Sequence, residues 1–88
     1  RQNQTNGKVQ MGVVRLAPGE KRPLEGFARH TQDEFSYVIK GSAHTVLEDG
    51  TDLTGNPGDC QWIEAGEGHI NYNDGTETAE VVWFLVER

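Results

Sequence analysis

The chain has 88 residues, enough for one compact domain, and we expect residues 1–88 to form that single domain. Fourteen acidic residues against eight basic ones give a formal net charge of −6, so the surface should repel nucleic acid and anionic lipid. The sequence contains no apolar run of about 18 residues, the length that a membrane-spanning helix requires. These features predict a protein without a nucleic-acid or membrane partner.

The single cysteine, Cys60, excludes an internal disulfide, so packing, a metal or self-association must stabilise the fold. A chain with this cysteine usage is expected to be cytoplasmic. It begins at Arg1 rather than at a methionine, and we therefore expect it to be trimmed, processed or a fragment.

Turn-forming residues divide the sequence at short intervals, a spacing that is typical of antiparallel strands in a sandwich or barrel. The segments between the turns are rich in β-branched and aromatic residues, which suit a pleated, half-buried surface. We predict six or more strands, at residues 9–16, 35–40, 43–47, 61–63, 69–72 and 79–86. The longer stretch at residues 20–34 contains Pro23 and Gly26 without a helical apolar period, and this predicts an extended or looped entry into the next strand.

Alternation along the predicted strands separates inward from outward side chains. Phe35, Tyr37 and Ile39 share one face, whereas Ser36 and Val38 share the other and are the candidates for pocket lining. The strand at residues 79–86 is apolar on both faces. One face should fill the interior and the other should meet a second sheet or another subunit, so we expect a homodimer.

Three residues have the chemistry of metal ligands. His30 and Glu34 are four positions apart, so on one continuous strand both would project to the same side, and His69 opens a later strand. Two imidazoles and one carboxylate form the facial triad that suits non-haem iron(II), and they also suit manganese, nickel or zinc. The remaining coordination positions would stay open to water or to a small-molecule substrate.

Two segments resemble the conserved motifs of the cupin superfamily. Residues 26–41, GFARHTQDEFSYVIKG, are similar to the first motif, with Glu34 and Gly41 at the family spacing and His30 at the second histidine position. Ala28 occupies the position of the first histidine. Residues 58–73, GDCQWIEAGEGHINYN, are similar to the second motif; Glu64 replaces its usual proline, and four motif positions are kept by Gly58, Gly66, His69 and Asn73.

The resemblance implies an all-β fold, the double-stranded β-helix or jelly-roll barrel, with one divalent metal ion (iron, manganese, nickel or zinc) held by His30, Glu34 and His69. Because Ala28 has no donor atom, three alternatives stay open: a three-ligand site, a substitute ligand, or a barrel that has abandoned its metal. His44 is the only other histidine and would be the substitute if its strand aimed it inward; otherwise it is a surface histidine.

Other conspicuous residues have structural interpretations. We expect Cys60 to be a small buried apolar residue, and Trp62 and Trp83 to lie in the core or in an interface. Gly41, Gly58 and Gly66 should occupy turns that require a positive φ.

Two functions are compatible with the sequence. The first is a metal-dependent enzyme acting on a small molecule, since dioxygenase, isomerase and decarboxylase activities all occur among cupins. The second is a non-catalytic small-ligand-binding or structural module with a degenerate metal site, which the alanine at position 28 favours. Whether the chain is an enzyme stays open at this stage.

Overall fold

The computed structural model describes residues 4–5 and 8–88, in which nine strands form two antiparallel sheets. The first sheet has the strand order β1 (Gln4–Thr5), β2 (Val9–Leu16), β9 (Ala79–Val86), β4 (Asp33–Lys40), β7 (Cys60–Ile63). The second has the order β3 (Lys21–Arg22), β8 (His69–Tyr72), β5 (Ala43–Leu47), β6 (Asp52–Gly55). The all-β prediction is confirmed, and this part of the chain has no helix long and apolar enough to cross a membrane.

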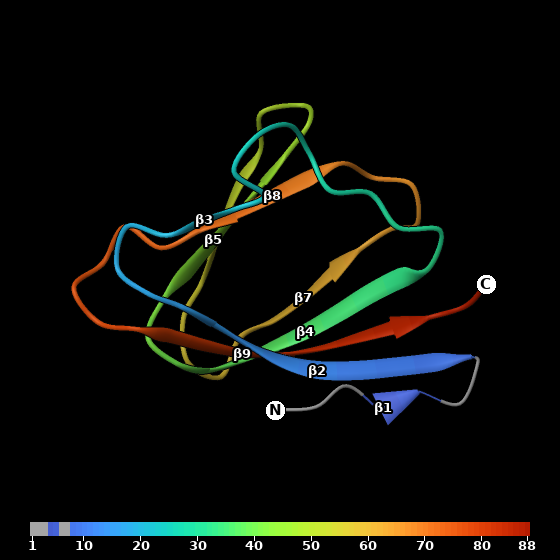
Figure 1. Ribbon diagram of the computed structural model, residues 1–88, viewed down its shortest axis with the longest axis horizontal. Helices are drawn as coiled ribbons and strands as arrows, with labels where there is room; N and C mark the ends of the chain where they lie inside the picture. The colour runs from blue at the N-terminus through green and yellow to red at the C-terminus, as the bar shows by residue number, and fades with distance from the viewer. Residues whose placement is uncertain (1–3, 6–7) are drawn as a thin grey trace.

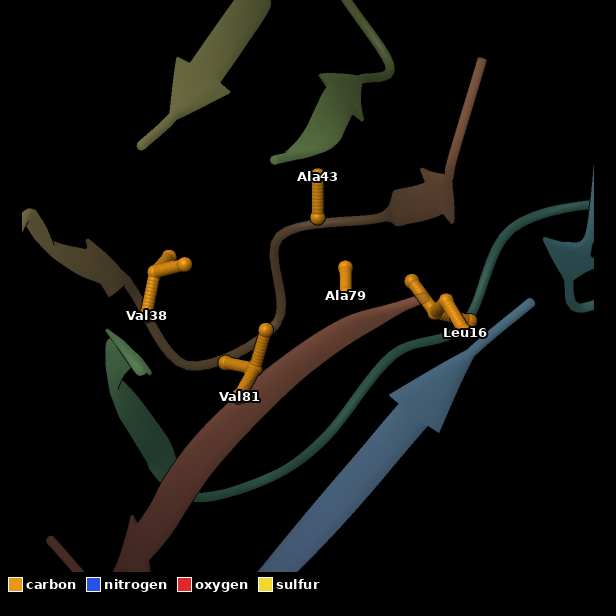
Figure 2. Close-up of a cluster of buried hydrophobic side chains, with 5 residues drawn as sticks. All are labelled: Leu16, Val38, Ala43, Ala79 and Val81. Carbon is orange, nitrogen blue, oxygen red and sulfur yellow. The ribbon is translucent and has the colours of Figure 1, made fainter. Parts of the chain in front are cut away.

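The two sheets lie face to face, as Figure 1 shows. They are closest where β4 ends and β5 begins, and they diverge toward the end where β4 and β8 start (Figure 1). At the close end, an apolar cluster from both sheets fills the interior, and Ala43 is its contribution from the second sheet (Figure 2). Its other members are Leu16, Val38, Ala79 and Val81. Burial of each leucine or valine here stabilises the fold by about 1.5–3 kcal/mol.

Alternation along β4 predicted its two faces correctly. Glu34, Ser36 and Val38 line the interior, whereas Phe35 and Tyr37 are exposed on the outer face. In the register of the first sheet, Ser36 lies between Trp83 of β9 and Gln61 of β7. The inner face of β4 therefore carries polar side chains toward the open end and the apolar Val38 toward the closed end.

The structure contains short strands that sequence reasoning did not predict, namely β1, β3 and β6. Strand β6 pairs with β5 as a hairpin whose turn is closed by hydrogen bonds from the Leu47 and Gly50 amides to the Thr51 and Leu47 carbonyls. Its sequence, DLTG, is too polar and too short to show a β pattern. The residues 20–34 are otherwise largely loop, as expected, although β4 begins at Asp33.

One expectation for β7 is wrong, because Cys60 is exposed rather than buried. Trp62, with 57% of its surface exposed, does not lie in the core, and its place in an interface stays a prediction. The reason is that alternation along β7 directs these two side chains to the outer face of the sheet, opposite the inward Gln61 and Ile63. Trp62 instead stacks on Phe35 of β4, with ring centroids 6.3 Å apart.

The glycine predictions are confirmed at the turns. Gly41, Gly58 and Gly66 have φ values of 68°, 93° and 84°, in the left-handed region that favours glycine. Gly41 is also held tightly, because a Cβ at this position would lie 2.7 Å from the Thr78 carbonyl oxygen.

Candidate metal centre

The three predicted ligands come from separate places in the chain and meet between the sheets at their wider end. Glu34 lies near the start of β4, and His69 is the first residue of β8. His30 belongs to the loop before β4, so the premise of one continuous strand through His30 and Glu34 is wrong. The loop is fixed instead by a hydrogen bond of 2.7 Å from the Gly66 amide to the His30 carbonyl oxygen.

The side chains of these residues converge on one point. A potential ligand atom from each lies within 4.8 Å of the other two. The Glu34 Oε1 atom is 3.4 Å from His30 Nε2 and 3.6 Å from His69 Nε2. These separations are longer than a good hydrogen bond, which spans about 2.7–3.2 Å, and they leave space for a cation between the three atoms.

The electrostatics of the three groups favour a cation there. Burial lowers the pKa of the His69 imidazole, and a hydrogen bond to the Glu67 carbonyl oxygen acts in the opposite direction. When His69 Nδ1 donates to that oxygen, Nε2 directs a lone pair toward Glu34. Burial also raises the pKa of the Glu34 carboxyl, which the nearby His30 partly offsets. Two acceptor atoms therefore face each other in a poorly solvated place, and a proton or a metal ion would relieve this.

A cavity of about 340 Å³ adjoins the three residues, a volume in the range of small-molecule sites. Apolar side chains from β2 and β9 form one wall, and Trp83 turns into it. Strands β4, β5, β7 and β8 contribute polar side chains as well as the apolar Val38, Ala43 and Ile63. Arg22 is the one lysine or arginine on the lining, considering the described part of the chain, and it pairs with Glu20 at 2.7 Å.

Comparison with known proteins identifies the family. The family model for the cupin domain matches residues 12–85. This chain is a cupin. No curated protein matches it. Among solved structures, a cupin family protein with a double-stranded β-helix fold from Methanocaldococcus jannaschii superimposes with a TM-score of 0.86 at 18% identity, over 96% of this chain and 74% of the other.

Some structural neighbours are enzymes. A sugar phosphate isomerase of the cupin superfamily from Silicibacter pomeroyi has a TM-score of 0.76 and 30% identity, covering 93% of this chain and 52% of its own. A DMSP lyase from Ruegeria pomeroyi has a TM-score of 0.80 at 18% identity, covering 92% of this chain and 39% of its own. The present cupin thus spans about half or less of the length of these two enzymes.

The first motif of this cupin lacks one histidine, and the structure shows what stands there. Ala28 lines the cavity and forms an isolated bridge with His69, with amide-to-carbonyl distances of 2.9 and 3.0 Å in the two directions. Its backbone therefore keeps the loop against β8, but its methyl group provides no ligand atom.

His44 does not replace the missing ligand, because it lies on the outer face of β5. Its Nδ1 atom is 2.9 Å from Asp52 Oδ1, and its Nε2 atom is 3.1 Å from Asp74 Oδ1. The ring also stacks on Tyr72, with centroids 4.5 Å apart. The surface interpretation of His44 thus describes its position, although the side chain is well packed and only 17% exposed.

The last residue of the second motif, Asn73, has a structural role. Its side chain is buried and donates to the carbonyl oxygens of Leu16 and Glu77, both at 2.9 Å. Its Oδ1 atom accepts from the Gly75 amide at 2.8 Å. Asn73 therefore connects the end of β2 with the loop that leads to β9.

The cavity residues that sequence reasoning missed include three uncharged polar ones, Thr45, Gln61 and Asn71. Parity contained the signal for Asn71, which is two positions from the predicted ligand His69, whereas Gln61 had none because the inward face of β7 was not predicted. Thr45 had no such signal, because the face of β5 that points inward was not predicted.

Proposed function

We propose that this cupin, with its two sheets forming a jelly-roll barrel, binds one divalent metal ion through His30, Glu34 and His69 and a small molecule in the adjoining cavity. The observation that supports this most directly is the convergence of two imidazoles and a buried carboxylate at the edge of that cavity. Ion-sized space between acceptor atoms fits iron, manganese, nickel or zinc. When bound with three protein ligands, such a metal supplies Lewis acidity and open positions for a substrate.

The chain's own residues define what else the site can do. Tyr37 and Tyr72 both lie outside the cavity lining, so neither phenol serves as an acid or base in it. Among the lining residues that the structure describes, the titratable groups besides Arg22 are the three proposed ligands themselves. Any reaction in this cavity must therefore use the metal triad for most of its chemistry, and isomerase or lyase activity is compatible with that.

Metal analysis of protein purified without chelator tests the proposal. We expect one equivalent of metal in the parent, and its loss in His69→Ala and Glu34→Gln. His44→Ala is the matched control, because this histidine pairs with carboxylates on the outside of the fold and should keep the metal. Absence of metal from the parent, after incubation with iron(II), manganese, nickel and zinc in turn, would contradict the proposal.

Thermal unfolding provides a second readout. A metal that binds only the folded state at 100 times its Kd stabilises by about 2.7 kcal/mol. For a domain of this size, that corresponds to a rise in Tm of about 10–20 °C, which EDTA should reverse. His44→Ala should show the same rise, whereas His69→Ala and Glu34→Gln should show none.

A second candidate function is a small-ligand-binding module without metal. Ala28 is the observation that favours it, since the position that faces His69 has lost its donor atom. In that case the parent would contain no metal, EDTA would leave its Tm unchanged, and the variants of the triad would still bind small molecules.

We also propose that the protein is a homodimer formed through the outer face of the five-stranded sheet. Several large apolar side chains are exposed there, with 42% exposure for Phe35 and 57% for Trp62; Val13, Tyr37 and Ile39 extend the patch. Contiguous apolar surface of this kind is typical of interfaces.

Light scattering after size-exclusion chromatography tests the homodimer. The parent should elute with twice the chain mass, and the double variant Phe35→Ser/Trp62→Ser should elute as a monomer. Leu24→Ser is the control, because Leu24 is 82% exposed but lies in the loop after β3. A monomeric parent, or a double variant that remains dimeric, would refute the proposed interface.

A further inference from the structure

A second set of polar side chains lies one step further into the cavity than the metal triad. Ser36 is two positions after Glu34 in β4, and Asn71 is two positions after His69 in β8, so each shares the inward face of its proposed ligand. Gln61 pairs with Ser36 across β4 and β7, and Thr45 pairs with Asn71 across β5 and β8. Thr45, Gln61 and Asn71 are called the polar layer below.

Hydrogen bonding within the polar layer is incomplete. The Thr45 hydroxyl, in a residue that is only 4% exposed, is 2.9 Å from Gln61 Oε1 and 3.0 Å from Asn71 Oδ1. A hydroxyl has one hydrogen and can donate it to only one of these oxygens at a time. The other amide oxygen is left with a lone pair that has no donor from Thr45.

The side-chain amide nitrogens of Gln61 and Asn71 can also donate further hydrogen bonds. Over residues 4–5 and 8–88, the hydrogen bonds of the Gln61 and Asn71 side chains are those to Thr45, which involve their oxygen atoms. No buried side-chain nitrogen or oxygen in these ranges lacks a partner, so the amide nitrogens must lie at accessible positions. Asn71 and Gln61 both line the cavity, and Gln61 also borders a second pocket beside β6 and β7, so the polar layer can offer hydrogen-bond donors and an acceptor to a molecule in the cavity.

The charge of the layer restricts what that molecule carries at this end. None of the three residues is ionisable. Arg22, the cross-strand neighbour of Asn71, is the arginine on the cavity lining, and its ion pair with Glu20 at 2.7 Å offsets part of its charge. Burying a carboxylate or a phosphate without a counter-charge is costly, whereas a hydroxyl group both donates and accepts. Trp83 and Leu85 add apolar wall nearby, which suits the carbon skeleton of such a molecule.

We propose that the polar layer recognises the uncharged, hydroxyl-bearing end of a small molecule whose other end faces the metal triad. This inference rests on the proposed function in so far as the cavity must bind a small molecule. Asn71 is the principal specificity residue, because of the three residues in the polar layer it alone shares a strand and a strand face with His69. Thr45 is a positioning residue, since its hydroxyl orients the two amides.

Nuclear magnetic resonance of the ¹⁵N-labelled chain tests the proposal, with three ring compounds of similar size as probes. They are trans-cyclohexane-1,2-diol, which donates and accepts; cyclohexanone, which only accepts; and cyclohexanecarboxylate, which is charged. Each is titrated into metal-free and zinc-loaded protein while the side-chain amide signals of Asn71 and Gln61 are followed. The diol should shift both amide signals saturably and bind more tightly than the other two probes.

Variants separate recognition from folding. Asn71→Leu and Thr45→Val should each weaken the diol by about tenfold, the effect of losing one hydrogen bond and stranding its partner. Thr54→Val is the matched control, because Thr54 is exposed on β6. The Thr54→Val variant should bind the diol with the same affinity as the parent. The methyl resonances of each variant report whether it has kept the parent fold.

The outcomes also separate this inference from the metal proposal. Tighter binding of cyclohexanecarboxylate, an unchanged diol affinity in a folded Asn71→Leu variant, or the absence of any probe-induced shift in both metal states would overturn the inference. If zinc fails to bind but the diol still shifts the amide signals and depends on Asn71, the inference stands and the metal proposal falls.

Discussion

Replacing Gly41 and Gly58 by alanine provides a test of how backbone geometry closes the end of the cavity opposite the metal triad. Both glycines have a positive φ, 68° and 93°, so alanine at either position adopts the left-handed conformation at a cost of about 1–2 kcal/mol. The surroundings of the two glycines differ. A Cβ at Gly41 would lie 2.7 Å from the Thr78 carbonyl oxygen and 2.8 Å from Ala79 Cα, whereas a Cβ at Gly58 meets nothing within 4 Å.

The close contact of a Cβ at position 41 should make Gly41→Ala more destabilising than Gly58→Ala. Forcing a methyl group against rigid backbone costs roughly 1–3 kcal/mol more, because the start of β9 must move away. We therefore expect Gly58→Ala to lower the free energy of unfolding by about 1–2 kcal/mol and Gly41→Ala by about 2–5 kcal/mol. For a domain of this size each kcal/mol corresponds to a fall in Tm of about 4–8 °C.

Urea unfolding followed by tryptophan fluorescence measures the difference, in EDTA so that bound metal does not contribute. The slope of the free energy with urea concentration should be the same for both variants and the parent, which shows that the same surface is exposed on unfolding. An equal loss of stability in the two variants would refute the argument, because it would mean that Gly41 has no tighter contact with β9 than Gly58 has with its neighbours.

Two other predictions concern single side chains. Burial raises the pKa of the Glu34 carboxyl, so the folded protein binds this proton more tightly than the unfolded protein does. The metal-free parent should therefore lose stability as the pH rises from the ordinary carboxyl pKa through the raised value. Urea titrations at successive pH values should show this loss in the parent and not in Glu34→Gln, and the same pH dependence in both proteins would contradict the prediction. Asn73→Ala should lower the free energy of unfolding by roughly 2–5 kcal/mol, because it removes two hydrogen bonds to main-chain carbonyl oxygens in a buried position. Asn56→Ala, on the exposed turn before β7, is the control and should lower it by less than half as much in the same urea titration.

Much of the site followed from spacing that can be read directly in the chain. The separation of Glu34 from Gly41, and of Gly58 from His69, matched the cupin motifs, and the structure brings Glu34 and His69 to within 3.6 Å. Metal ligation by them stays a prediction. His30 also lies beside them, but it is positioned by a loop that is hydrogen-bonded to Gly66 and not by the strand that was expected.

Period-two alternation determined which side chains of β4 face inward, since successive Cβ atoms of a strand must project to opposite faces. Turn residues with positive φ likewise determined where the chain reverses, because glycine alone adopts that backbone conformation without steric cost. These are local properties, and they are contained in the order of the residues.

Only the tertiary structure decided which strands are neighbours and which lie at an edge. Cys60 and Trp62 are exposed because they lie on the outer face of the five-stranded sheet, which no other described strand covers, and His44 points outward because the inward face of β5 carries Thr45. The polar layer likewise exists only because β5, β7 and β8, from two different sheets, approach one another across the interior. Strand order is set by pairing between distant segments, and no local pattern in the sequence records which segments pair.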